Sequence, residues 1–314
     1  MDDILKYSWD INKITKNYLT HFLESGNPNL KIAVIDSGVD SSHPGLKDNV
    51  TFKENFVLNE ENIDYTGHGT MVCGQIVGNG EIKGIVPNCQ IDVIKVLNKN
   101  NSCSLRDLVR SLEYVYENDY HIVNLSLGLS TQNKPSKELE KAHLMIEKLY
   151  KKNTVCVNSV GYLESTFFHF PSNSPYTLTS QSLSRENKIV NEKLIANYCV
   201  PSGDYFDTKL DDYDDYDEYT TVFFPYQSTI ELKEKYPEKH NLPLGYIYSI
   251  GESLASAKLS GIIAAILSKY LTVNNKIIAI DKLLDILREN SININSRLYP
   301  NLELILIKIE EGKI

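Results

Sequence analysis

The sequence has few cysteines, and none of them forms a Cys-x-x-Cys pair. Its 314 residues include five cysteines, an odd number without a repeating spacing. A disulfide framework normally uses an even number of cysteines, so none is indicated here. Reduced thiols are usual in a reducing compartment, and we therefore expect mostly structural thiols and a cytoplasmic protein.

The sequence shows no pattern typical of a targeting or membrane-spanning segment. Residues 1–10 contain no basic leader, apolar core or small-residue cleavage site, so we expect no secretory signal. No apolar run reaches the roughly 18 residues that a membrane-spanning helix needs, and we expect no membrane partner. Basic residues are outnumbered by acidic ones, 32 to 41, and the net charge of −9 disfavours a nucleic-acid partner.

The chain is long and apolar enough to bury a large core. Hydrophobic residues make up 42% of it, and we expect one domain over residues 1–314. Apolar runs with strand character alternate with apolar positions at helical spacing. Strands are predicted at 31–36, 91–96, 122–127 and 154–157, and helices after Ser104 and Ser136. The alternation predicts an α/β fold with a parallel sheet, in which reactive residues gather at strand carboxyl ends and helix N-termini.

A serine lies in the turn before a strongly apolar stretch. Residues 251–256 read Gly-Glu-Ser-Leu-Ala-Ser and precede an apolar helix, which places Ser253 at a helix N-terminus. Unpaired backbone N–H groups there can stabilise an anion beside its hydroxyl. Serine is also a common helix cap, so this stretch alone leaves a structural role open.

Two other stretches supply possible partners for this serine. The apolar run 31–36 ends in Asp36 before a glycine turn, which is typical of a buried parallel strand. His68 lies between small residues in the stretch 65–74. A nucleophilic serine needs a base within hydrogen-bond reach, and the base needs a group that fixes its tautomer. Asp36, His68 and Ser253 provide these three parts.

In their order of aspartate, histidine and serine, the three motifs resemble those of the subtilisin-like serine proteases. Two further stretches carry the resemblance: Lys-Gly-Ile-Val-Pro-Asn at 83–88 and Val-Asn-Leu-Ser-Leu-Gly at 123–128. The resemblance covers about residues 7–275. It implies the family's three-layer α/β fold, with a mostly parallel central sheet and helices on both faces.

The resemblance also implies a reaction and the residues that perform it. Ser253 would attack a peptide carbonyl, His68 would move the proton and Asp36 would orient the histidine. The segment Ser126, Leu127 and Gly128 would pair with the backbone of an extended substrate. After Ser256 the family commonly continues with proline and histidine, whereas this chain has Ala257 and Lys258, a departure expected to affect only the geometry of the helix start.

The second oxyanion donor of the family has no clear equivalent. The family has an asparagine after a glycine, whereas residues 158–162 read Asn-Ser-Val-Gly-Tyr. Counting along the strand gives Tyr162 the asparagine position, and Asn158 is the nearest amide but lies earlier. Both remain candidates. In subtilisin, a member of this family, losing one such donor lowers the rate about a hundred- to a thousandfold.

Two loops that hold calcium in secreted family members differ in this chain. Gly45 occupies a position where those members often have a calcium ligand, and the loop 78–81 is very short. We therefore expect no calcium, no other metal and no cofactor. Only about 30 residues precede Asp36, and from the resemblance we expect no pro-domain of the kind that secreted members have.

An insertion and a C-terminal extension are the other particular features. The insertion, about 204–245, contains eight acidic residues between Asp204 and Glu218. It is interpreted either as a solvated acidic loop or as a negative wall that attracts a cationic peptide. In the extension, about 276–314, we predict a helix over 280–287 and an edge strand over 302–309.

A cytoplasmic subtilisin-like enzyme without a pro-domain is similar to the lantibiotic leader peptidases, especially the intracellular branch of epilancin-type systems. The resemblance implies a peptide partner, a lanthipeptide precursor from which the leader is removed, and we expect a monomer. Three alternatives stay open: a housekeeping intracellular protease, a maturation scaffold that binds peptides with little turnover, and an esterase.

Overall fold

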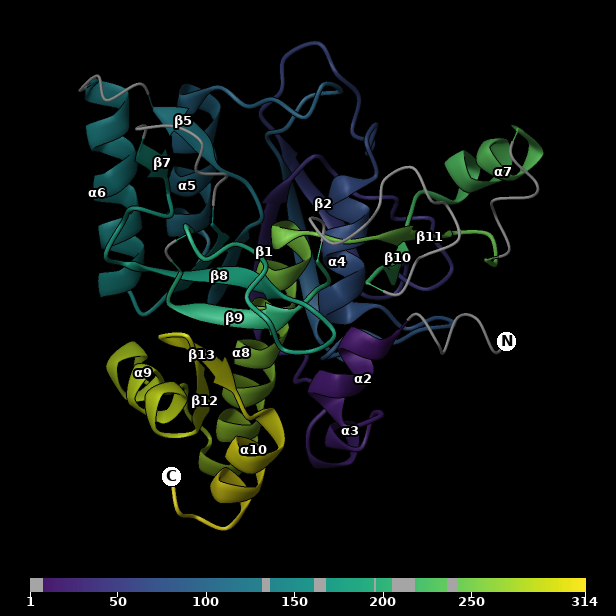
Figure 1. Cartoon of the computed structure of the whole chain (residues 1–314). Helices are drawn as coiled ribbons and strands as arrows, with labels where there is room; N and C mark the ends of the chain where they lie inside the picture. Colours follow the sequence, from purple (N-terminus) through teal and green to yellow (C-terminus); the bar gives the residue numbers. More distant parts are fainter. Residues whose placement is uncertain (1–7, 132–135, 161–167, 195, 205–217, 236–241) are drawn as a thin grey trace.

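A nine-stranded sheet forms the centre of the computed structural model, which describes residues 8–131, 136–160, 168–194, 196–204, 218–235 and 242–314 (Figure 1). The strand order is β12-β13-β9-β8-β6-β4-β1-β3-β2. All neighbouring pairs in it are parallel except β12 and β13. The strands are β1 (Lys31–Asp36), β2 (Val50–Asn55), β3 (Gln90–Lys95), β4 (Ile122–Leu125), β6 (Val155–Ser159), β8 (Thr177–Leu183), β9 (Tyr198–Pro201), β12 (Ser291–Ile294) and β13 (Arg297–Pro300).

Helices cover both faces of this sheet (Figure 1). The helices of the described residues are α2 (Trp9–Thr15), α3 (Thr20–Leu23), α4 (His68–Val77), α5 (Leu105–Glu117), α6 (Lys137–Lys151), α7 (Tyr226–Lys235), α8 (Glu252–Asn274), α9 (Ile280–Glu289) and α10 (Leu302–Glu310). Of these, α7 lies to one side, beside β11 (Figure 1). Successive side chains of a strand point to opposite faces. In β1, Ile32 and Val34 accordingly pack in the core under α4 and α8, and Ala33 and Ile35 in the core under α5 and α6. The predicted three-layer α/β fold is confirmed.

The predicted helix starts on one face are also confirmed. The Ser104 hydroxyl accepts a hydrogen bond from the backbone N–H of Asp107, and the Ser136 hydroxyl accepts one from that of Leu139. Each serine thus satisfies a backbone donor that the first helical turn leaves unpaired.

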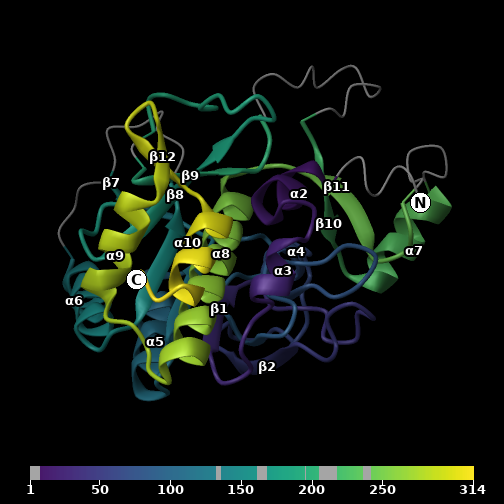
Figure 2. The ribbon, with the colours of Figure 1, turned by 90° about the horizontal axis from the view of Figure 1, so that it is seen from below.

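The edge strand predicted over 302–309 is wrong, because this segment forms α10. Its buried residues follow the helical period, and Asn301 caps the helix by accepting from the N–H of Leu304. Leu302, Ile305, Leu306 and Ile309 are the buried residues. The sheet edge is formed instead by the hairpin of β12 and β13, while α10 packs on α8 (Figure 2).

Helix α8 is long and apolar enough, by length and composition, to cross a membrane, and it is the one such helix in the described ranges. Its most apolar window, however, is 94% buried inside the protein. That burial is what the central helix of a folded core requires, so its apolar character follows from packing.

Part of the insertion contributes to the core. Strand β10 (Thr220–Phe223) is buried and pairs antiparallel with β11 (Tyr246–Ser249), which leads into the serine turn. The ring of Phe223 packs on α4, where a Cβ on Gly74 would lie 2.2 Å from it. Most of the acidic stretch, residues 205–217, lies outside the described residues. A second small sheet joins β5 (Leu129–Thr131) to β7 (Phe168–Phe170).

Phe223→Ala should lower the free energy of unfolding by about 3–5 kcal/mol, because it leaves a cavity against the glycine face of α4. The measurement is equilibrium denaturation by urea. Phe22→Ala is the control, since Phe22 is 89% exposed and its loss should cost less than about 0.5 kcal/mol. Equal losses for the two variants would show that β10 does not belong to the core.

Candidate active site

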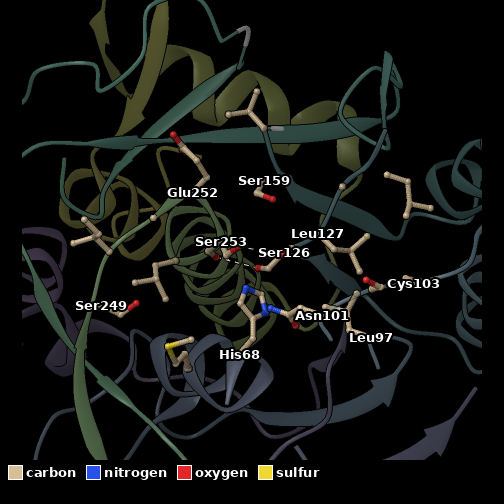
Figure 3. Close-up of a pocket in the computed structure, with 18 residues that line it drawn as sticks. His68, Leu97, Asn101, Cys103, Ser126, Leu127, Ser159, Ser249, Glu252 and Ser253 are labelled. Carbon is tan, nitrogen blue, oxygen red and sulfur yellow. Dashed lines mark hydrogen bonds between the residues drawn. The ribbon is translucent and has the colours of Figure 1, made fainter. Parts of the chain in front are cut away.

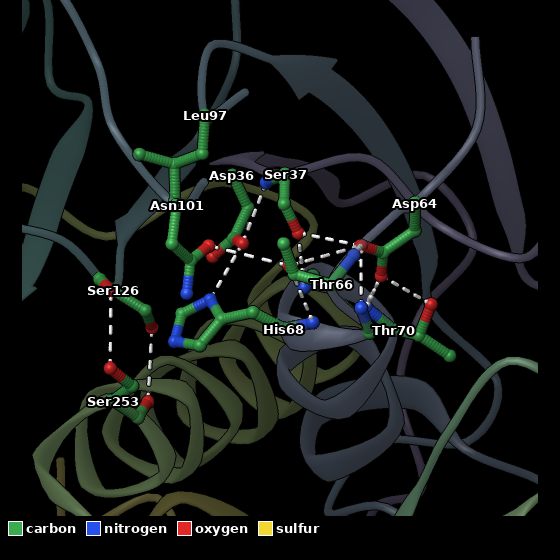
Figure 4. Close-up of polar contacts among 12 residues, drawn as sticks. Asp36, Ser37, Asp64, Thr66, His68, Thr70, Leu97, Asn101, Ser126 and Ser253 are labelled. Carbon is green, nitrogen blue, oxygen red and sulfur yellow. Dashed lines mark hydrogen bonds and ion pairs between the residues drawn. The ribbon is translucent and has the colours of Figure 1, made fainter. Parts of the chain in front are cut away.

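Asp36 and His68 form a hydrogen-bonded pair at the carboxyl end of the sheet. Asp36 is the last residue of β1 and is fully buried, and its Oδ1 lies 2.7 Å from Nδ1 of His68. The same oxygen accepts from the backbone N–H of Ser37 at 2.7 Å. His68 is the first residue of α4, so its ring reaches the strand end from the helix start (Figure 4).

Asp64 fixes the start of this helix and was not predicted from the sequence. One of its carboxylate oxygens accepts from the N–H of Gly67 at 2.9 Å and from the Ser37 hydroxyl at 2.8 Å. The other accepts from the N–H and the hydroxyl of Thr70 (Figure 4). The sequence Asp-Tyr-Thr-Gly at 64–67 is typical of a turn, but Asp64 lies three residues before the N-cap Gly67, so the capping rule for the N-cap position would not have identified it.

The surroundings raise the pKa of His68 above its ordinary value of 6.5. Burial alone would lower it, but the negative charge of Asp36, the hydrogen bond to Asp36 and the charge of Asp64 outweigh burial. These groups favour the protonated imidazolium. A base that takes a proton during a reaction is thereby stabilised in its charged form.

Ser253 lies at the start of α8 on the other side of the site. Gly251, just before the helix, has φ 139°, a conformation that favours glycine. The Ser253 hydroxyl donates to the carbonyl of Ser126 at 3.2 Å (Figure 4). The N–H of Ser253 is in the first helical turn, where backbone donors have no partner within the helix. A backbone donor at this position can bind an anion.

The Ser126 side chain holds the two elements together beneath the nucleophile. Its buried hydroxyl lies 2.7 Å from the amide oxygen of Asn124, 2.7 Å from the hydroxyl of Ser256 and 3.0 Å from the carbonyl of Ser253. The end of β4 and the start of α8 are thus connected by hydrogen bonds. The side chain of Ser126 serves structure, while its backbone borders the pocket.

A pocket of about 550 Å³ lies between His68 and Ser253 (Figure 3). His68 and Ser253 line it, together with all three predicted substrate-binding residues, Ser126, Leu127 and Gly128. The structure therefore brings the predicted triad together: Asp36 bonds His68, and His68 shares the pocket with Ser253. The Ser253 hydroxyl bonds the Ser126 carbonyl here, so the roles of the triad in catalysis stay predictions.

Of the two predicted oxyanion donors, the structure describes Asn158 but not Tyr162. Asn158 is buried on β6, its amide donates to the carbonyl of Ser159 at 2.9 Å, and it does not line the pocket. It would have to leave this position to donate to a substrate. Ser159 and Val160 line the pocket instead. Tyr162 lies outside the described residues, and the second donor stays a prediction.

No group of three or more His, Cys, Asp or Glu side chains in the described part of the chain could hold a metal ion. The expected absence of a metal and of a cofactor stays a prediction.

The fold and this pocket bring together the residue types that serine hydrolases use. Comparison with protein families gives the more particular result: residues 27–279 match the subtilase family, peptidase S8. The chain belongs to this family.

Comparison with individual proteins also finds serine proteases. The chain is 26% identical over 308 residues to the epidermin leader peptide-processing serine protease EpiP of Staphylococcus epidermidis, covering 85% of this chain and 66% of that protein. It is 38% identical over 109 residues to the major intracellular serine protease of Bacillus subtilis, covering 32% of this chain and 34% of that protein. The chain thus spans just under two thirds of the epidermin relative.

A solved structure shows the same fold over nearly the whole chain. The crystal structure of a lanthipeptide protease superposes with a TM-score of 0.85 and 20% identity, covering 98% of this chain and 96% of the other. At this identity the likeness establishes the fold.

Ser253→Ala should abolish turnover and leave peptide binding intact, because the substitution removes only the attacking oxygen and keeps the backbone N–H. In subtilisin, a member of this family, loss of the nucleophile lowers kcat about two-millionfold. Turnover and the Kd of a labelled peptide are the two measurements. Ser268→Ala, on the same helix, should keep its turnover. A Ser253→Ala variant with substantial activity would refute the triad assignment.

The rate should fall with acidification through an apparent pKa above 6.5, because the neutral imidazole is the base and the pKa of His68 is raised. Asp64→Asn removes one of the charges that raise this pKa, so the acid limb of kcat/KM should move to lower pH. Asp119→Asn, at an exposed carboxylate, should leave the profile in place. An acid limb that does not move in Asp64→Asn would contradict the electrostatic account.

Proposed function

We propose that the protein is a serine endopeptidase that removes the leader from a lanthipeptide precursor in the cytoplasm. The observation that carries the proposal is the Asp36–His68 hydrogen bond, 2.7 Å long, in a site whose pocket also contains Ser253. Membership of the subtilase family supports the chemistry. The similarity to an epidermin leader peptide-processing protease supports the substrate class.

The geometry suggests how such an enzyme acts. Ser253 Oγ attacks the carbonyl carbon, and His68 takes its proton and later gives it to the leaving amine. Asp36 holds the imidazole by Nδ1 and stabilises the imidazolium. The N–H of Ser253 donates to the oxyanion, and its position at the positive end of the α8 dipole favours that negative charge.

The rim of the pocket suits an extended peptide. Residues 126–128 lie between β4 and β5 and belong to neither strand. Their backbone can therefore pair with a substrate that adds itself as a further strand. Such pairing requires a segment without its own secondary structure, and the leader of a precursor peptide meets this requirement.

The cytoplasmic location is supported by the thiols. All five cysteines are free in the structure, and four of them are buried. Unpaired thiols persist in a reducing compartment.

A general intracellular protease is the second candidate. The stretch of 38% identity to the major intracellular serine protease of Bacillus subtilis favours it. Such an enzyme would degrade many unfolded proteins, whereas a leader peptidase would cut one bond.

Intact-mass analysis after incubation with a modified lanthipeptide precursor, and separately with casein, distinguishes these functions. We expect a single cut at the leader boundary, intact casein, and no cut by Ser253→Ala. Degradation of both substrates would favour the general protease. If neither were cut, the protein would be a peptide-binding scaffold with little turnover; if only simple esters were hydrolysed, it would be an esterase.

A further inference from the structure

A buried lysine, Lys258, lies five residues beyond the nucleophile on α8. The Lys258 side chain has no exposed surface, and its ammonium forms an ion pair of 2.5 Å with Asp10, a fully buried carboxylate on α2. Burial lowers the pKa of Lys258, and the charge of Asp10 opposes this. A buried ammonium is costly unless it is paired. The position of Lys258 therefore depends on α2 lying in its place.

Both members of the pair have a second partner. Asp10 Oδ1 accepts a hydrogen bond of 2.5 Å from the hydroxyl of Thr220, the first residue of β10. Lys258 donates to the hydroxyl of Ser202 at 3.0 Å. The ion pair thus connects the amino-terminal helix, the central helix and the segments around β9 and β10.

Ser202 connects this pair with the turn that carries Ser253. Its carbonyl accepts from the N–H of Gly251 at 3.3 Å. The neighbouring strand adds a second tie, because the N–H of Ser182 donates to the Glu252 carboxylate at 2.5 Å. The two residues before Ser253, Gly251 and Glu252, are therefore held by Ser202, which bonds Lys258, and by the adjacent strand β8.

We propose that Asp10 and Lys258 are positioning residues for Ser253: the docked α2 helix places the Lys258 ammonium, which holds Ser202 and, through it, the Gly251 turn. The inference rests on the proposed function, because it concerns the reactivity of Ser253. Displacing a reacting group by about 1 Å can lower a rate about a hundredfold. A purely structural ion pair would change how much protein is folded, and would leave the rate of the folded protein unchanged.

The test uses a fluorophosphonate, which labels an activated serine whatever peptide the enzyme prefers. Ser253 Oγ forms a bond to phosphorus as the phosphorus–fluorine bond breaks; fluoride leaves, and His68 takes the hydroxyl proton. We expect Lys258→Met to lower the maximal labelling rate about ten- to a hundredfold, with the half-saturating concentration unchanged. Each variant is measured well below its Tm, so that the rate refers to folded protein.

Lys269→Met is the matched control. Lys269 lies further along α8, is largely buried, pairs with Glu310 and donates to the carbonyl of Leu23 at 3.0 Å. It thus makes the same kind of tie between α8 and the amino-terminal segment, but far from Ser253. We expect its Tm to fall and its labelling rate to match the wild type.

The double variant Asp10→Asn with Lys258→Met separates stability from positioning. It removes both charges and keeps an acceptor for Thr220, so that, unlike Lys258→Met alone, it leaves no buried carboxylate without its counter-charge. We expect the double variant to regain much of the Tm lost in Lys258→Met but to stay slow, because the bond to Ser202 is still missing.

Two results would overturn the inference and leave the proposed function intact: wild-type labelling in folded Lys258→Met, or a labelling rate that recovers with the Tm in the double variant. A wild-type protein that is not labelled at Ser253 would contradict both the inference and the proposed function.

Discussion

The hydrogen bond between Asp36 and His68 is the interaction on which the site depends, and it constrains elements that are distant in the sequence. A buried carboxylate is tolerated only when hydrogen bonds stabilise its charge. Strand β1 must therefore end where its last residue meets the imidazole, and its pairing with β3 and β4 fixes that end. Helix α4 must begin at His68, and the capping bonds of Asp64 determine that start.

The second constraint is that the nucleophile comes from a different helix. The carboxyl ends of parallel strands and the N-termini of the helices that follow them meet at one edge of a sheet. Ser253 and His68 can therefore lie close together although they are far apart in the sequence. Hydrogen bonds of serine hydroxyl groups then hold the start of α8, which carries Ser253, against β4. Ser126, Ser256 and Ser260 connect β4 to α8 by hydrogen bonds, and Asn124 completes the set. A polar network buried in this way is favourable because its groups are satisfied.

Sequence analysis identifies features whose signal lies within a few neighbouring residues. The strand ending at Asp36, the helix starts after Ser104 and Ser136, and the serine turn are of this kind, and the structure contains all of them. The edge strand predicted over 302–309 failed because its apolar residues fit both a period of two and a helical period. Only packing on α8 decides between them. Contacts between residues far apart in the sequence, such as Phe223 with Gly74, have no signal in the residues next to either partner.

Lys258 shows what this limit means for function. As a departure from the family pattern it suggests a small change at a helix start, and no residue three or four positions away on the helix offers a counter-charge. The structure supplies one from Asp10, which precedes the part of the chain that matches the family, residues 27–279. An unpaired ammonium in this core would be costly, so the lysine and the amino-terminal helix depend on each other. The segment before the family match is therefore part of the structure that surrounds the nucleophile.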